Sequence, residues 1–310
     1  MHIVMTGGTA GIGLHAARAL LATGNNRLVV GVRDEAKARF SLGPRPELAQ
    51  LDLADLESVR RFAETIGPFG PIDALVLNAG LQTTSLQRSA QGYELTFATN
   101  HLAHYLLARL LLPAMAPGGR IILTSSGLHD PEMKAPMPPP RHADSKRLAF
   151  PGEDPARDVK EGVAGRRAYA ASKLCNLMTA RELAVRLSDD PRSLMVAAFD
   201  PAFTPGTGLA RHYPAWADWL FRRILPIVVR GPLVSTPACS GGWLAALAAD
   251  PAYAASRGDY WSVRSKRLVA AQPSQLARNA DAARRLWDDS AALVGLPAEL
   301  RYRMEATEAA

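Results

Sequence analysis

The chain has 310 residues, of which 48% are hydrophobic and 21% charged, as in an ordinary globular protein with one large domain. The net charge is +7, but the basic residues are interspersed with acidic ones and form no run of like charges, so no nucleic-acid partner is expected. Cys175 and Cys239 form no C-x-x-C pair and no cluster with histidine, which argues against a metal or disulfide framework and favours a reducing, cytoplasmic location.

Short apolar segments alternate with helical patterns along the chain. Strands are predicted at residues 2–6, 27–33, 47–53, 72–80, 119–126 and 194–200, and helices at 14–24, 55–66, 93–115 and 167–187. Most of these strands are continuous apolar runs, which is typical of strands buried on both faces of a parallel sheet. We therefore predict one α/β domain over residues 1–310, a doubly wound (Rossmann) parallel sheet with helices on both faces.

Two segments interrupt this alternation of strands and helices. Within a proline-rich insertion at 128–166, residues 131–162 carry many prolines and charges without a period, so an irregular surface segment is expected. Residues 203–232 combine aromatic side chains with prolines and glycines and are expected to form a substrate flap. Its apolar part, 216–229, is too short to span a bilayer; it either packs against the sheet or contacts a membrane surface peripherally.

The stretch TGGTAGIG lies between the first predicted strand and the first predicted helix. Gly7, Gly11 and Gly13 allow a tight turn whose backbone N–H groups can approach a pyrophosphate at the helix N-terminus. In this strand–turn–helix context we favour a dinucleotide site over a structural turn.

The end of the second strand bears on which dinucleotide binds. Arg33 can pair with a 2′-phosphate, which favours NADP(H) over NAD(H), whereas the alternative has Asp34 holding the ribose hydroxyls. Asp52, at the end of the third strand, is expected either to cap the next helix or to lie beside the adenine.

Five motifs in order carry a resemblance to a known family. They are Thr6-Gly7-x3-Gly11-x-Gly13, Asn78-Ala79-Gly80, Asn100, Ser125-Ser126 and Tyr169-x3-Lys173. The last pair lies on one helix face, about one turn apart. By these motifs, over nearly its whole length, the chain resembles the short-chain dehydrogenase/reductase family.

The resemblance implies catalytic roles for Asn100, Ser126, Tyr169 and Lys173, with Ser125 as the alternative to Ser126. It implies cofactor contacts from Gly7, Thr9, Gly11, Ile12, Gly13, Arg33, Asp52, Leu53, Asn78, Ala79, Gly80, Tyr169, Lys173, Pro201 and Thr204, and no metal. Tyr169 would exchange a proton with the substrate oxygen, and a nearby ammonium would lower the pKa of its phenol. Ser126 would donate a hydrogen bond to that oxygen, Lys173 would hold the nicotinamide ribose, and Asn100 would anchor a water.

Segments around residues 169–184, 207–213, 258–263 and 283–296 resemble the light-dependent protochlorophyllide reductase and retinol dehydrogenase-like branch of the family. That branch carries a proline-glycine-cysteine after the sixth strand, whose cysteine is the proposed proton donor to the reduced double bond. This chain has Pro201-Ala202-Phe203 there, and phenylalanine cannot donate a proton.

We therefore expect an NADP(H)-dependent oxidoreductase that interconverts a hydrophobic carbonyl compound and its alcohol. The alternatives are a light-dependent C=C reductase and a dinucleotide-binding sensor without catalysis. The resemblance leaves open a homo-oligomer through the helices that carry Asn100 and Tyr169. His129 is expected at the surface, although its distance from Ser126 in sequence would let it reach the substrate.

Overall fold

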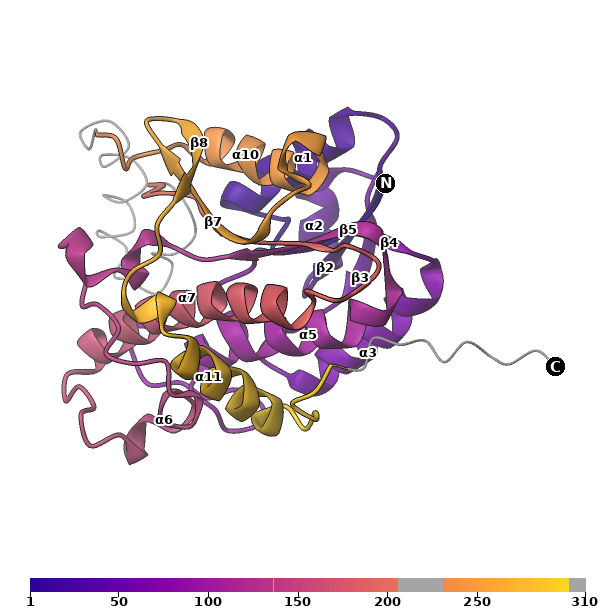
Figure 1. The fold of residues 1–310 in the computed structure, drawn as a ribbon. Helices are drawn as coiled ribbons and strands as arrows, with labels where there is room; N and C mark the ends of the chain where they lie inside the picture. Colours follow the sequence, from indigo (N-terminus) through magenta and orange to yellow (C-terminus); the bar gives the residue numbers. More distant parts are fainter. Residues whose placement is uncertain (136, 206–230, 301–310) are drawn as a thin grey trace.

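A computed structural model describes residues 1–135, 137–205 and 231–300 of the chain (Figure 1). The described strands are β1 (His2–Thr6), β2 (Arg27–Val32), β3 (Glu47–Gln50), β4 (Ile72–Leu77), β5 (Met115–Thr124), β6 (Met195–Asp200), β7 (Arg257–Arg264) and β8 (Arg267–Ala271). They form one sheet in the order β3-β2-β1-β4-β5-β6-β7-β8. Neighbouring strands are parallel except β7 and β8, which are antiparallel. The predicted doubly wound α/β fold is confirmed.

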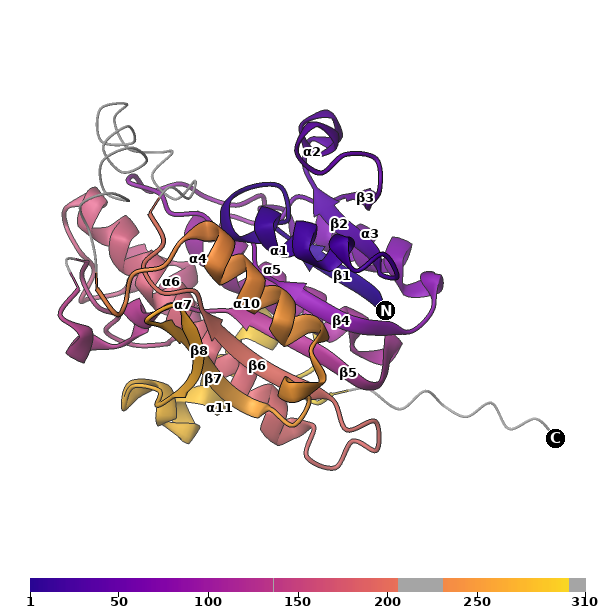
Figure 2. The same ribbon diagram turned by 90° about the horizontal axis from the view of Figure 1, so that it is seen from above.

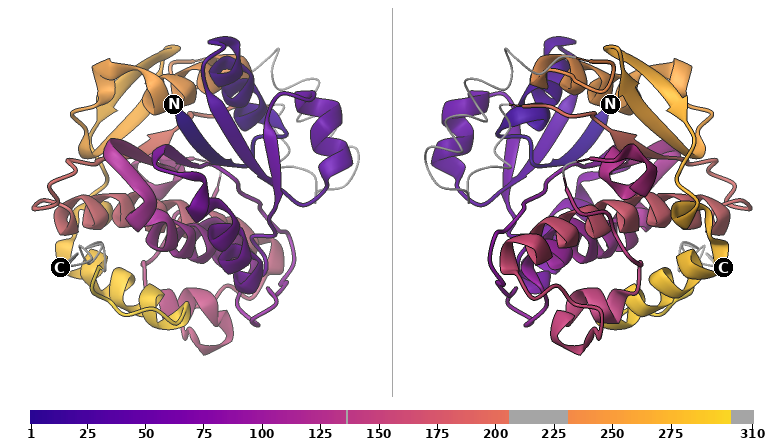
Figure 3. Two further views of the ribbon diagram at one scale, coloured as in Figure 1. Left: turned by 90° about the vertical axis from the view of Figure 1, so that its right-hand side faces the viewer. Right: turned by 90° about the vertical axis from the view of Figure 1, so that its left-hand side faces the viewer.

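Helices cover both faces of this sheet (Figures 1 and 2). The described α-helices are α1 (Gly11–Ala22), α2 (Glu35–Leu42), α3 (Leu56–Ile66), α4 (Leu95–Phe97), α5 (Ala103–Leu111), α6 (Ser145–Ala149), α7 (Glu161–Arg186), α10 (Pro237–Ala249) and α11 (Ala280–Leu293). On one face α1 packs against α10, and on the other lie α3, α5 and α7. Figure 3 shows α11 and α6 on the outer side of α7, away from the sheet.

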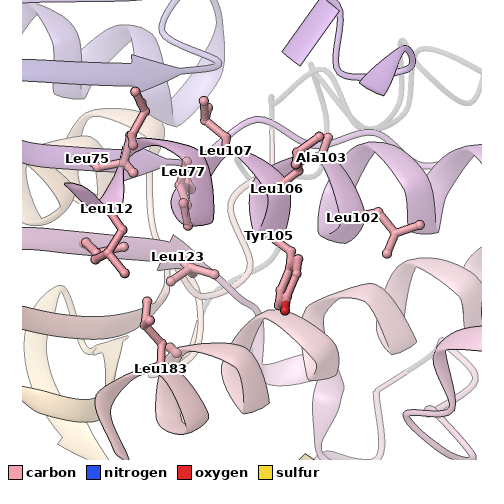
Figure 4. Packing of buried hydrophobic residues seen from close by; sticks show 14 of the residues in the cluster. Leu75, Leu77, Leu102, Ala103, Tyr105, Leu106, Leu107, Leu112, Leu123 and Leu183 are labelled. Atoms are coloured by element: carbon pink, nitrogen blue, oxygen red, sulfur yellow. The ribbon is translucent and has the colours of Figure 1, made fainter. Parts of the chain in front are cut away.

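The central strands are buried on both faces, as their continuous apolar sequences predict. Every residue of β1 and β6 is buried, and so are five of the six residues of β4. Figure 4 shows the layer between the sheet and α5 and α7, where Leu183 points toward the strand that carries Leu123. Both leucines are at most 1% exposed, so this layer is part of the main apolar core.

The six predicted strands are present, but β7 and β8 were not predicted from the sequence. Buried and exposed positions alternate along most of β7, unlike the continuous apolar runs by which the other strands were recognised. The turn between the two strands places Ser265 and Lys266 at φ of 49° and 63°, where glycine or asparagine would normally signal a hairpin.

The helix predicted at 93–115 is interrupted. It begins as α4 and passes through a π-helical turn, η2 (Ala98–Leu102), before it continues as α5. Within η2 the N–H of Ala103 donates to the carbonyl of Ala98, five residues back. Turns of this kind occur mostly as single insertions within α-helices, often at functional sites. Here the turn contains Asn100.

The insertion contains a short α-helix with two buried residues. This helix is α6, whose residues Ser145 and Ala149 are fully buried, and the carbonyl of Ala149 accepts the N–H of Glu94. The helix predicted at 167–187 begins earlier, at Glu161, inside the segment assigned to the insertion. The prediction of an irregular segment was therefore wrong at Ser145–Ala149 and from Glu161 onward, because short polar helices anchored by a few buried small residues give no apolar period. The predicted surface position holds for most of 151–160.

Helix α11 covers the outer faces of α5 and α7. Trp287 is 1% exposed, with its ring edge-on to Tyr105 at 4.8 Å between centroids. The guanidinium carbons of Arg109 and Arg186 lie 5.0 and 4.9 Å from the centre of the indole. An oligomer stays a prediction, but it would have to use surface that α11 does not cover.

Among the helices in the described ranges, none combines the length and apolarity needed to cross a bilayer. The apolar segment 216–229 and most of the predicted flap lie outside the described residues.

Replacing Trp287 with alanine should lower the free energy of unfolding by about 3–5 kcal/mol, because a buried indole and its contacts with α5 and α7 are lost. Urea denaturation followed by circular dichroism measures this. Val185→Ala on α7 is the control, since that side chain is 67% exposed and should change stability little. A loss below about 1 kcal/mol for Trp287→Ala would show that α11 does not hold the core.

Candidate active site

The predicted site residues gather at the carboxyl edge of the sheet, where β1 and β4 are neighbours and the chain order reverses. The hydroxyl oxygen of Thr6, at the end of β1, accepts the N–H groups of Asn78 and Ala79 at 3.0 and 3.1 Å. It also lies 3.0 Å from Nε2 of His104 on α5. These bonds hold the loop after β4 against the end of β1.

The tautomer of His104 follows from its partners. Its Nδ1 lies 3.0 Å from the carbonyl of Asn100, which can only accept, so Nδ1 carries the proton. Nε2 therefore accepts the hydroxyl proton of Thr6. Burial, and then the charge of Lys173, lower the pKa of His104 to about 3, so the ring is neutral.

The glycine turn fits a phosphate-bearing ligand. Gly7 and Gly11 have φ of 69° and 52°, and a Cβ on Gly13 would lie 2.0 Å from the carbonyl oxygen of Gly7. The residue before α1, Ala10, gives no side-chain cap, and the first turn contains no acidic residue. The backbone donors at the start of α1 are thus not occupied by a capping side chain, which suits an anion. Thr9 and Ile12 are half-buried in this turn.

Asp34 and Arg33 have different environments at the end of β2. The carboxylate of Asp34 caps α2 by accepting the N–H of Lys37 at 2.9 Å. The guanidinium of Arg33 is exposed and forms no hydrogen bond or ion pair within the described part of the chain. Arg33 is thus the freer of the two residues for a ligand beside this strand.

Asp52 does not cap the next helix. The N-cap of α3 is Asp55, whose carboxylate accepts the N–H of Glu57, whereas Asp52 accepts the N–H of Ala54 in the turn before it. The capping alternative for Asp52 was wrong because this turn supplies a second aspartate three residues later. Leu53 beside it is 8% exposed.

Asn100 clamps the loop that follows Asn78-Ala79-Gly80. Its amide accepts the N–H of Leu81 at 2.8 Å and donates to the carbonyl of Leu81 at 2.9 Å and to Ser172 Oγ at 3.0 Å. A Cβ on Gly80 would lie 3.4 Å from Oδ1 of Asn100 and 3.5 Å from Nζ of Lys173. Asn100, Gly80 and Lys173 therefore meet at one point.

Tyr169 and Lys173 lie side by side on α7, and both are buried. The Nζ atom of Lys173 is 5.6 Å from the centre of the Tyr169 ring and donates to the carbonyl of Thr124, at the end of β5, at 3.0 Å. Burial lowers the pKa of Lys173 to about 8, opposed by the charge of Asp200, so at neutral pH the ammonium form prevails. Burial, and then Asp200, raise the pKa of Tyr169 above its ordinary value.

The pKa of the Tyr169 phenol is not depressed, contrary to the expectation from the neighbouring ammonium. Burial of the phenol raises its pKa, and the carboxylate of Asp200 raises it further, so Tyr169 keeps its proton. A protonated phenol is the form that can donate a proton to a carbonyl oxygen.

The two adjacent serines have different surroundings. The hydroxyl of Ser125 is buried and donates to the carbonyl of Lys173 at 2.8 Å. Ser126 is half-buried, and its oxygen accepts the N–H of Leu128 at 3.3 Å, which leaves its proton available. This geometry favours Ser126 as the donor to a substrate oxygen.

The end of β6 carries a buried carboxylate that was not among the predicted site residues. Asp200 is 4% exposed and accepts hydrogen bonds from Tyr260 Oη at 3.0 Å, Ser262 Oγ at 2.8 Å and the N–H of Ala202 at 3.0 Å. Its charge acts on both Tyr169 and Lys173. The sequence signal was an acidic residue ending an otherwise apolar strand.

The turn after β6 has alanine at a position whose backbone conformation favours glycine. Ala202 has φ of 60°, in the left-handed region that disfavours a Cβ. Pro201 and Thr204 are buried, and the hydroxyl of Thr204 donates to the carbonyls of Pro201 and Ala202 at 3.1 and 3.2 Å. Phe203 is 41% exposed.

His129 is not at the surface, so that expectation was wrong. It is 2% exposed, its Nδ1 donates to the carbonyl of Ser126 at 2.8 Å, and its Nε2 accepts the N–H of Ser274 at 3.2 Å. Both ring nitrogens are therefore used to brace the loop that carries Ser126. In the part of the chain that the structure describes, no cluster of potential metal ligands occurs.

Known proteins share both sequence and fold with this chain. A profile of the family described as short chain dehydrogenase matches residues 1–135. Protochlorophyllide reductase A of Oryza sativa subsp. japonica is 35% identical over 320 residues, covering 95% of this chain and 80% of that protein. Protochlorophyllide reductase of Avena sativa is 33% identical over 320 residues, covering 95% of this chain and 99% of that protein.

Two solved structures extend the comparison. An uncharacterized protein from Mycobacterium paratuberculosis superposes with a TM-score of 0.69 at 26% identity, covering 97% of this chain and 94% of that chain. A blue fluorescent protein from a metagenomic library, in complex with NADPH, has a TM-score of 0.60 at 26% identity, covering 84% and 95%. With 35% identity to a relative aligned over 95% of the chain, this protein belongs to the short-chain dehydrogenase/reductase family and resembles its protochlorophyllide reductase branch.

Proposed function

We propose that this protein is an NADP(H)-dependent oxidoreductase that interconverts a hydrophobic carbonyl compound and its alcohol. The observation that carries the proposal is the buried pair of Tyr169 and Lys173, placed where the strand ends and the loop after β4 meet. A protonated phenol beside an ammonium is suited to proton exchange with an oxygen atom.

The cofactor assignment rests on the glycine turn and on Arg33. The uncapped start of α1 suits the pyrophosphate, and the exposed guanidinium at the end of β2 suits a 2′-phosphate. The similar metagenomic protein binds NADPH, which supports the same choice here.

Each side chain has a definite part in carbonyl reduction. When bound, the reduced nicotinamide supplies a hydride to the carbonyl carbon. Tyr169 transfers its phenolic proton to the carbonyl oxygen, and the ammonium of Lys173 stabilises the phenolate that remains. Ser126 donates a hydrogen bond to the same oxygen and orients it toward Tyr169. In alcohol oxidation the same proton returns to Tyr169.

The hydrophobic substrate is inferred from the sequence of residues 203–232, most of which lie outside the described residues. Tryptophan, phenylalanine, leucine and isoleucine in that segment favour an apolar ligand. A peripheral membrane contact through 216–229 rests on the same composition and stays a prediction.

Light-dependent C=C reduction is the second candidate. It is favoured by the identity with protochlorophyllide reductases over 95% of the chain. It is disfavoured at Phe203, which replaces the cysteine that this branch is thought to use as proton donor and has no transferable proton.

Arg33→Ser should weaken the binding of NADPH about 10- to 100-fold, because charge-assisted hydrogen bonds to the 2′-phosphate are lost. Fluorescence titration of the bound nicotinamide gives the Kd. NADH is the internal control, since it lacks that phosphate, and its Kd should change less than about twofold. Equal losses for both dinucleotides would mean that Arg33 does not contact the phosphate.

Tyr169→Phe should reduce kcat about 10²- to 10⁴-fold while the Kd for NADPH is kept, because only the proton donor is removed. NADPH oxidation is followed against a panel of aldehydes, ketones and polycyclic quinones. Tyr253→Phe, a tyrosine on the far side of β7 from α7 whose ring packs on Trp261, is the matched control and should keep full turnover. Turnover in Tyr169→Phe equal to that of the wild type would refute the assigned role.

Protochlorophyllide with NADPH should show no illumination-dependent loss of substrate, because Phe203 cannot supply the second hydrogen as a proton. Absorption spectra before and after illumination test this. Product formation that appears only in the light would establish the second candidate and displace the first.

A further inference from the structure

Asn176 lies three residues after Lys173, on the same helix, and its side chain is fully buried. Its Nδ2 donates to two backbone carbonyls, those of Asn100 and Thr124, each at 3.0 Å. Both oxygens can only accept, so the orientation of the amide follows from its partners. Its Oδ1 lies 3.3 Å from Nδ1 of His101, which therefore donates.

Each of the two carbonyls is shared with a second group. The carbonyl of Thr124 also accepts the ammonium of Lys173 at 3.0 Å, and the carbonyl of Asn100 also accepts Nδ1 of His104 at 3.0 Å. A carbonyl oxygen has two lone pairs, so the oxygen of Thr124 can accept both donors. The amide of Asn176 occupies one lone pair and leaves the other to Lys173. The same amide ties the π-helical turn η2 to the end of β5.

We propose that Asn176 is a positioning residue that fixes the ammonium of Lys173 for the nicotinamide ribose, by holding the carbonyls of Thr124 and Asn100. This inference rests on the proposed function and deepens it. Without the amide, the carbonyl of Thr124 would accept Lys173 alone, and the ammonium would settle toward β5. The carbonyl of Asn100 would lose one of its two side-chain donors, and η2 could shift.

The network that orients Asn176 extends to the C-terminal helix and the insertion. The Nε2 atom of His101 lies 3.0 Å from Ser290 Oγ on α11, which lies 2.9 Å from Ser145 Oγ on α6. All three side chains are fully buried. Burial lowers the pKa of His101 to about 4, so the ring stays neutral and its Nε2 can accept a hydrogen bond from the hydroxyl of Ser290. Side chains on α6 and α11 are thus connected, through His101 and Asn176, to the carbonyl of Thr124 that accepts Lys173.

A double-mutant cycle on NADPH binding tests whether Asn176 acts through Lys173. The four proteins are the wild type, Asn176→Leu, Lys173→Met and the double variant, and nicotinamide fluorescence gives each Kd. Asn176→Leu alone should weaken NADPH binding about tenfold, and it should add less than about twofold in the Lys173→Met background. That non-additivity is a result which general damage to the fold would not produce.

Thr179→Val is the matched control. Thr179 lies one turn further along α7, is 2% exposed, and its hydroxyl has no hydrogen-bond partner among the described residues. Because no hydrogen bond to the described residues is lost, its replacement by an isosteric apolar side chain should change the Kd less than about twofold. If Asn176→Leu does not fold, Asn176→Ser takes its place in the cycle, because one short hydroxyl cannot reach both carbonyls.

Two results would overturn the inference: an unchanged Kd in the Asn176 variant, or an equal penalty with and without Lys173. If Lys173→Met itself binds NADPH as tightly as the wild type, the proposed contact of Lys173 with the cofactor fails, and the role of Asn176 fails with it. A weaker Kd in Lys173→Met together with an unchanged Kd in Asn176→Leu removes only the role of Asn176.

Discussion

The buried ammonium of Lys173 is the group on which the arrangement of the site depends. A charge that is 2% exposed is costly unless it is paired and hydrogen-bonded. Here the carbonyl of Thr124 accepts it directly, and the carboxylate of Asp200 adds an opposite charge from the end of the next strand. Helix α7 must therefore lie in one register across β5 and β6. That register also places Tyr169, one turn earlier, at the carboxyl edge of the sheet.

The same edge is held together by hydrogen bonds that join elements far apart in sequence. Thr6 binds the loop after β4, and Asn100 binds the backbone of Leu81 beyond it. His104 connects the hydroxyl of Thr6 to the carbonyl of Asn100. Each donor and acceptor in this group has a partner, and buried networks of this kind are rigid when they are fully satisfied. The glycine turn and the helices that carry Asn100 and Lys173 are thus parts of one rigid structure.

Helix α11 and the insertion enlarge this core on the outer side of α7. Trp287 packs between two guanidinium groups on α5 and α7, while Ser290 and Ser145 continue the hydrogen bonds of His101. A segment whose sequence is polar and without a period therefore supports α7. The alignment with Avena sativa protochlorophyllide reductase covers 95% of this chain and 99% of that protein.

The amino-acid sequence by itself determined the parallel sheet, the glycine turn and the pairing of Tyr169 with Lys173, because apolar runs, turn glycines and helical spacing are local properties. It could not reveal β7, whose alternating burial lacks a continuous apolar run, or the burial of His129. Nor could it find Asp200 and Asn176, since one aspartate at a strand end and one asparagine on a helix are common. Only the tertiary structure decided their roles, because a buried polar group acquires its function from partners that the fold brings from distant segments.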